Sequence, residues 1–450
     1  MSIKRKVLAL AVAAVLTTGA QAQQQVNSKG TGQVLMFPFY NLENNSNTFM
    51  HISNNTGDKK AIKVRLMEHR NSETILEFNA YLGPYDVFPI ALDADGSNGV
   101  LLATDESCTV PELGTANGDF SGTQTELADG RLLRKQPLVP YLYSDDASNS
   151  IGRTLRGHAE VIEMGVIDES IDVADCGALR ALWNNGTWST SPATNVTGPT
   201  GGLSGASYFI NPDLAYSVSI DVTAIDGWAK EGVNYHSSPV TGKPTLADGS
   251  TTAVVGDTVV DYTGQTNGAV LATSAVLSTD SILNEVQVES GIAAETDWVV
   301  TFPTKKYLTN GTTAGAPFTK VYDGTKVDNV ACETMTLSQF DRETEGSTGS
   351  GAFVPASGGV AGDLCDTVSV LSFASSGSAL LVNDTTTVKF PFQNGAARLV
   401  ADQAVPADNN GVVVKGLPVI GFAGTRIVNG PMSYGYTAPH KASNTITSGG

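Results

Sequence analysis

Residues 31–92 contain five runs in which apolar and polar residues alternate, and only short turns separate these runs. The run AIKVRL, at residues 61–66, places its aliphatic side chains on one side and Lys63 and Arg65 on the other. A helix would scatter these side chains over several faces, whereas a strand places every second residue on one face. We therefore expect a β-meander of half-buried strands that founds the core.

The same alternation recurs along the chain and sets the expected fold class. Residues 76–82 repeat it after a break at Asn71–Ser72 and are the natural hairpin partner of residues 61–66. A helix is predicted over Asp172–Trp183, with Asp175 as its N-cap. The chain is therefore expected to be mostly β, with antiparallel β-sandwich-like domains, long polar loops and few short helices. Further strands are expected at 158–167, 211–224, 283–289, 297–303, 368–373 and 417–422. Long polar loops are expected over 93–129 and 236–268.

The N-terminus has the features of a secretory signal. Lys4, Arg5 and Lys6 precede an apolar run, and Ala20-Gln21-Ala22 supplies small residues for cleavage, so the mature chain should begin at Gln23. No later stretch has the roughly 20 apolar residues of a membrane-spanning helix. The predicted organisation is a signal peptide at 1–22, an N-terminal β domain at 23–184, a linker or long loop at 185–205, and a C-terminal β domain at 206–450.

The charge balance excludes one class of partner. The formal net charge is −18, and removing the signal peptide takes away basic residues only. Binding to nucleic acid draws on clustered Lys and Arg, so nucleic acid is not an expected partner. The acidic balance suits a protein kept soluble by repulsion until divalent cations such as Ca²⁺ screen or bridge its carboxylates. An acidic exported protein with no ionic partner is the alternative.

Four cysteines occur, and their number is even. In an oxidising compartment an even number favours disulfides, and four cysteines allow three connectivities. We favour Cys108–Cys176 with Cys332–Cys365, because each pair then lies within one half of the chain. The spacings match no zinc pattern.

Two short acidic stretches are the candidate calcium sites. Asp93 and Asp95 lie in a run rich in Asp and Gly, and Asp145 and Asp146 are adjacent in a second run. An EF-hand loop that began at Asp93 would need Gly at its sixth position and Glu at its twelfth, and neither is present. Asp and Gly in an ordinary turn are the alternative explanation.

Two tryptophans are the candidate sugar-binding residues. Trp188 lies in a polar loop and Trp228 follows a turn, where an exposed indole can stack on a sugar ring. The same side chain can instead anchor its loop on the core. No nucleophile elbow, phosphate loop, dinucleotide fingerprint or zinc-protease motif is present, so an enzyme is not expected.

The strand-forming segments also carry a resemblance to a known family. The segments GTGQVLMFPFYN (30–41), AIKVRLMEHRNSETILEFNAYLGPYDVF (61–88), DWVVTFPTKKYL (297–308) and GLPVIGFAGTRIVNG (416–430) follow in order along most of the mature chain. The chain resembles secreted cell-surface proteins of gammaproteobacteria, some of which are described as surface-layer and biofilm-matrix proteins. These segments are strand signatures and carry no catalytic residues.

The resemblance implies a place and a role. We expect a secreted protein on the outer face of the outer membrane that self-assembles into a surface layer or extracellular matrix. Its expected partners are further copies of itself, together with outer-membrane lipopolysaccharide or matrix polysaccharide. Calcium is expected to bridge the acidic loops of neighbouring copies. The alternative is a secreted adhesin that binds glycans through Trp188 and Trp228 and does not polymerise.

Overall fold

The computed structural model describes residues 22–448 with short gaps. The gaps are 117–120, 140–150, 240, 323–330, 344–345, 348–352, 355–361, 375–376 and 431. The described part is mostly β, with several antiparallel sheets, so the predicted fold class is confirmed. The helices found there are α1 (Cys176–Asn184), α2 (Gly268–Leu277) and α3 (Lys305–Thr309), with 3-10 turns η1 (Ile151–Leu155), η2 (Thr187–Ser189), η3 (Leu246–Asp248) and η4 (Ser290–Ile292).

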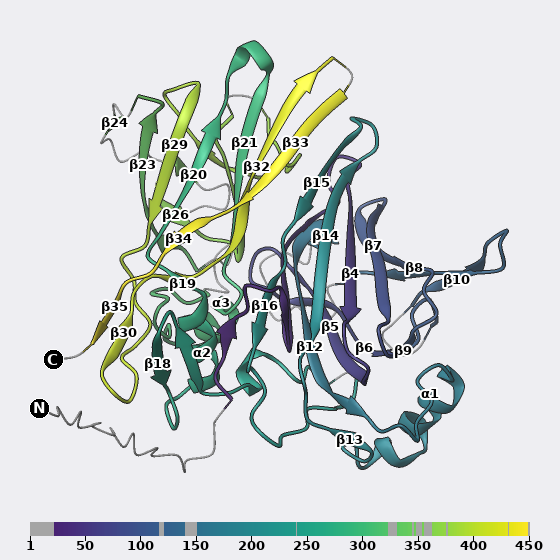
Figure 1. The fold of residues 1–450 in the computed structure, drawn as a ribbon. Coiled ribbons are helices and arrows are strands. Elements are labelled where there is room, and N and C mark those ends of the chain that lie inside the picture. Colours follow the sequence, from purple (N-terminus) through teal and green to yellow (C-terminus); the bar gives the residue numbers. More distant parts are fainter. Residues whose placement is uncertain are drawn as a thin grey trace, which may run out of the picture.

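Two sheets form a first sandwich, on the right of Figure 1. Sheet 1 runs in the order β1 (Gln25–Val26), β16 (Thr223–Asp226), β3 (Val34–Asn41), β12 (Arg156–Ile167), β5 (Lys59–Glu68), β6 (Thr74–Leu82) and β9 (Cys108–Val110), with β13 (Val196–Thr197) beside β12. Sheet 2 runs in the order β10 (Thr123–Glu126), β11 (Leu132–Pro137), β8 (Asn98–Ala103), β7 (Val87–Asp95), β4 (Asn47–Asn54), β14 (Leu203–Asn211) and β15 (Tyr216–Ile220), with β2 (Thr31–Gly32) beside β14.

The core of the first sandwich is built by the predicted alternation. β5 and β6 pair in antiparallel register, with Val64 opposite Phe78. Phe78 meets Phe88 of sheet 2 edge to face, with ring centroids 6.1 Å apart. The apolar side chains on these inner faces are buried, and each removes a large apolar area from water. The predicted hairpin of residues 61–66 with 76–82 is confirmed.

Two further sheets form a second sandwich, on the left of Figure 1. Sheet 3 runs in the order β24 (Gly346–Ser347), β23 (Thr336–Asp341), β29 (Asn394–Val400), β20 (Ser281–Gln287) and β34 (Lys441–Ser443). Sheet 4 runs in the order β25 (Phe353–Val354), β28 (Thr386–Val388), β27 (Val368–Ser372), β21 (Ala294–Thr301), β32 (Ile420–Asn429) and β33 (Met432–Pro439). Smaller pairs are β17 (Thr252–Val255) with β18 (Thr258–Asp261), β19 (Ser278–Thr279) with β31 (Leu417–Pro418), β22 (Glu333–Thr334) with β26 (Asp363–Leu364), and β30 (Val412–Val414) with β35 (Ile446–Ser448).

The two sandwiches share a buried contact. Phe39 of β3 packs edge to face on Phe422 of β32, with ring centroids 6.1 Å apart. The hydroxyl of Thr301 donates to the carbonyl of Pro38 at 2.7 Å. The backbone N–H of Val368 donates to the carbonyl of His69 at 2.8 Å. This contact buries Phe39, and all eight residues of β3 are buried.

The chain leaves the first sandwich later than the predicted domain boundary. Residues 203–226 form β14, β15 and β16, which pair with strands of sheets 1 and 2. A C-terminal unit that began at residue 206 would separate these strands from their partners. Residues 185–205, predicted as a linker or long loop, contain η2 and β13 and lead directly into β14. The predicted polar loop over 93–129 is also wrong in part, because residues 93–103 complete the β7–β8 hairpin.

The second face of sheet 1 is buried, although its alternating charges indicated a half-buried strand. Lys63 and Arg65 are 0% and 1% exposed. Arg65 Nε donates to Glu77 at 3.1 Å, and its Nη1 donates to Glu160 of β12. Arg65 therefore has two partners of opposite sign, which is the condition for burying an ion at tolerable cost, whereas Lys63 is held by backbone carbonyls.

A single stretch of chain covers this charged face. We call residues 236–239 and 241–246 the covering segment. Arg65 Nη2 donates to the carbonyls of Gly242 and Pro244, each at 3.1 Å, and Glu77 accepts from the N–H of Gly242 at 2.9 Å. Lys63 donates to the carbonyl of Pro239 at 2.9 Å. The irregular backbone of the covering segment therefore hydrogen-bonds the buried charges, and the charges in turn supply partners for its carbonyls and N–H group.

Removal of the central guanidinium tests this arrangement. We expect Arg65→Ala to lower the free energy of unfolding by roughly 3–5 kcal/mol, because Glu77 and Glu160 would stay buried without a cation. Urea unfolding followed by tryptophan fluorescence measures the change. Arg131→Ala is the control, because Arg131 pairs with Asp129 on the surface with more than half of each side chain exposed. Equal stability of the two variants would contradict a structural role for the charged face.

Candidate interaction surface

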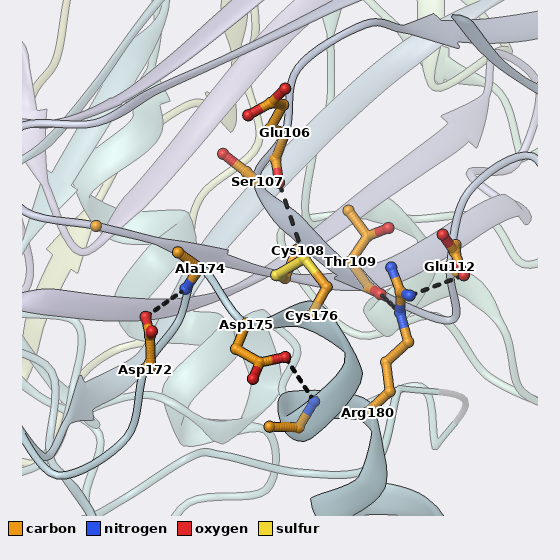
Figure 2. Close-up of a disulfide and its surroundings, with 12 residues drawn as sticks. Glu106, Ser107, Cys108, Thr109, Glu112, Asp172, Ala174, Asp175, Cys176 and Arg180 are labelled. Atoms are coloured by element: carbon orange, nitrogen blue, oxygen red, sulfur yellow. Dashed lines mark hydrogen bonds and ion pairs between the residues drawn. A yellow bond between two sulfur atoms is a disulfide. The ribbon is translucent and has the colours of Figure 1, made fainter. Parts of the chain in front are cut away.

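The disulfide that joins sheet 1 to α1 has the favoured connectivity. Cys108 of β9 bonds to Cys176 at the start of α1, with their Cα atoms 5.1 Å apart (Figure 2). Asp175 accepts from the N–H of Ala178 at 2.9 Å, so the predicted N-cap is confirmed. Arg180 pairs with Glu112 at 2.8 Å beyond the disulfide. One covalent bond and one ion pair therefore hold the helix on the edge of the sheet.

The second disulfide lies in the other half of the chain. Cys332 bonds to Cys365, so the favoured pairing is confirmed for all four cysteines. Lys305 of α3 donates to the carbonyl of Cys365 at 2.5 Å. Two disulfides fit an extracellular protein, because such bonds persist in oxidising compartments.

Both candidate sugar-binding tryptophans are buried. Trp188 is 1% exposed and Trp228 is 0% exposed. Trp188 stacks on Tyr81 of β6 with ring centroids 5.7 Å apart, and Trp228 packs on Tyr235 at 4.8 Å. Neither indole presents a face to solvent, so the prediction of exposed stacking rings at these positions is wrong. The alternative, in which the side chain anchors its loop on the core, is confirmed, because both rings pack on the second face of sheet 1.

A buried histidine lies in the same aromatic cluster. His236 Nδ1 is 2.6 Å from the carbonyl of Pro192, and its Nε2 is 2.9 Å from the hydroxyl of Tyr81. Trp183 donates to that hydroxyl at 2.7 Å. Because a carbonyl only accepts, Nδ1 carries the proton and Nε2 accepts from Tyr81. Burial lowers the pKa of His236 to about 4.

This pKa gives a signed pH dependence. Between pH 6.5 and 4 the unfolded chain binds a proton at His236 that the folded chain does not, so stability falls as the pH falls. We expect His236→Gln to remove on the order of 3 kcal/mol of that fall. Urea unfolding at pH 7, 5.5 and 4.5 measures it. His158 and His440 remain and act in the same direction, so the slope should shrink without vanishing. An unchanged slope would contradict a neutral His236.

Of the four candidate calcium ligands, the structure describes two. Asp93 and Asp95 lie on β7, where Asp93 accepts from Asn47 at 2.5 Å and Asp95 pairs with Lys135 of β11 at 2.6 Å. Asp145 and Asp146 lie outside the described residues. In the part of the chain that the structure describes, no three His, Cys, Asp or Glu side chains gather in a way that could hold a metal ion.

Strand β33 carries a stripe of large exposed side chains that the sequence interpretation missed. Met432, Tyr434 and Tyr436 are 45%, 52% and 43% exposed, and every second residue puts them on one face. Ile427 of β32 lies directly opposite Tyr434. We call these four residues the β33 stripe. The stripe runs along the outermost strand of sheet 4, on the β32–β33 hairpin at the top of Figure 1.

Contacts with β15 and the residues just before it hold β33 in place. The hydroxyl of Thr437 donates to the carbonyl of Ser219 at 2.6 Å, and the N–H of Ser433 donates to the carbonyl of Leu214 at 3.0 Å. A Cβ at Gly435 would lie 2.3 Å from the ring of Tyr216, so this position requires glycine. The alternation of Met432, Tyr434 and Tyr436 with small residues is the signal that could have found the strand.

This geometry suits a contact surface. Tyr and Met are enriched at protein interfaces, and Tyr supplies much contact area for little ordering cost. No family model matches the chain, and no curated protein or solved structure shows a significant match to it. Among the described residues, no helix is both long and apolar enough to cross a membrane.

Proposed function

We propose that this chain is a structural cell-surface protein that assembles with copies of itself into a surface layer or extracellular matrix. The observation that supports the proposal best is the β33 stripe. Its side chains project from a strand that is fixed on its other face, so it presents a preformed apolar surface. Preformed surfaces bind with little loss of conformational entropy. The proposal assigns no catalytic activity to the chain.

Charge supports a role for divalent cations in this assembly. The chain carries 45 acidic and 27 basic residues, so copies repel one another until the charge is screened. Carboxylate oxygens are the ligands that Ca²⁺ prefers. We propose that calcium bridges carboxylates between copies rather than filling a site within one copy. Lipopolysaccharide or matrix polysaccharide would hold the assembly at the outer membrane.

The glycan-binding alternative loses the residues on which it depended. Trp188 and Trp228 close the second face of sheet 1 and are not available to a sugar. A monomeric adhesin would need other aromatic rings. Assembly without any ligand separates the two functions, since only the structural protein polymerises alone.

Electron microscopy and sedimentation of the mature protein test the proposal. We expect ordered assemblies with added calcium, and dispersal with a chelator. The variant Met432→Ser/Tyr434→Ser/Tyr436→Ser should raise the protein concentration needed for assembly at least about tenfold, a cost of ~1.4 kcal/mol.

The matched control is Tyr85→Ser, which removes a tyrosine that is 72% exposed and lies on a turn of the first sandwich. It should assemble like the unmodified protein. Circular dichroism should show that the triple variant keeps its fold, since the three side chains are exposed. Monodisperse particles under all conditions would contradict self-assembly. Assemblies that survive the chelator would contradict the cation bridge alone.

A further inference from the structure

The residues that follow the predicted signal peptide are built into the contact between the two sandwiches. Gln24 is 0% exposed. Its side-chain amide donates to the carbonyl of Ser250 at 2.6 Å and accepts from the hydroxyl of Thr273 at 2.8 Å. Its backbone N–H donates to Thr252 at 2.9 Å, and its carbonyl accepts from Val254 at 2.8 Å. The mature N-terminus is therefore a fixed part of the fold.

Gln23, the residue before it, packs with its backbone against Gly227. Its carbonyl lies so close to Gly227 that a Cβ there would be 2.1 Å away, and Gly227 has a φ of +64°. Among the described residues, no hydrogen-bond partner is found for the side-chain amide of Gln23. Gln23 is half-buried. Its side chain is thus free to turn back on its own backbone nitrogen, whereas that of Gln24 is not.

We propose that the exported protein carries a pyroglutamate at residue 23, formed by cyclisation of the new N-terminal glutamine. The α-amine attacks the Cδ carbon of its own side chain, a C–N bond forms, and the side-chain nitrogen leaves as ammonia. No oxidant, reductant or second substrate is consumed. The inference depends on cleavage after Ala22 and is independent of the proposed assembly.

The surroundings of the new terminus favour ring closure. In the uncut chain the carbonyl of Ala22 accepts from the hydroxyls of Ser250 and Thr252, the second at 3.0 Å. Both of these residues are only 5% exposed. After cleavage these two hydroxyls can accept from the new amine and hold it beside its own side chain, which favours ring closure. The lactam retains a carbonyl and an N–H, both of which can form hydrogen bonds in this position.

Mass spectrometry of the mature protein tests the proposal. The full mature chain is released from an N-terminal fusion so that Gln23 comes first, and it is then incubated folded or in urea. We expect the N-terminal tryptic peptide, residues 23–29, to become lighter by one ammonia several-fold faster in the folded protein than in urea. Protein exported by its own signal should carry the ring when purified cold at neutral pH.

Two variants act as controls. Gln23→Glu should keep an open N-terminus under these conditions, because loss of water from glutamate is much slower. Gln25→Ala should cyclise like the unmodified protein, since Gln25 is exposed on β1. Equal rates in folded and urea-treated protein would overturn the role of the fold. A free Gln23 in exported protein, or an N-terminus at another residue, would overturn the proposal itself.

Discussion

The fold depends on how one charged strand face is kept out of water. Arg65 lies in the middle of sheet 1 and contacts Glu77 on one neighbouring strand and Glu160 on the other. Such a face can be buried only if every charge and polar group finds a partner. The covering segment supplies carbonyls and an N–H for this purpose, so it must follow an irregular path across the sheet. Sheet 1 is therefore buried on both sides.

Burial on both sides makes the two halves of the chain interdependent. The covering segment leads from the last strand of sheet 1 toward the second sandwich, and the N-terminal Gln24 is fixed from the same direction by Ser250 and Thr273. Phe39 and Phe422 close the contact farther along β3. A body fixed in this way can present the β32–β33 hairpin at a constant angle. A constant angle is what an assembly of repeated copies requires.

The sequence predicted the features that depend on a short repeating pattern or on residues in the same half of the chain. The alternation at residues 61–66 and 76–82 identified strands and their inner faces, and Asp175 identified the start of a helix, because such signals act over a few residues. The favoured cysteine pairing is confirmed for both bonds. Sequence did not predict that Lys63 and Arg65 would be buried, and it left two interpretations of Trp188, of which the loop anchored on the core is confirmed. Their partners lie far along the chain, and no local pattern records them.

The candidate surface was missed for a related reason. The alternation around Met432 and Tyr434 is typical of a strand, but the exposure of these side chains depends on where the neighbouring sheets end. The acidic residues were located by composition, and composition could not show that Asp95 pairs with Lys135. The residue type alone does not tell whether a charged side chain lies on the surface or is buried. Only the three-dimensional contacts separate them.

Hydrogen exchange of the monomeric and assembled protein tests the central claim most directly, because it reports the fixed body and the contact surface together. The account predicts equal and strong protection of β5 and β21 in both states, with added protection on assembly over Met432–Pro439. Added protection elsewhere and none at β33 would contradict the proposed contact. Independent exchange of the two sandwiches in the monomer would contradict the single body on which that contact depends.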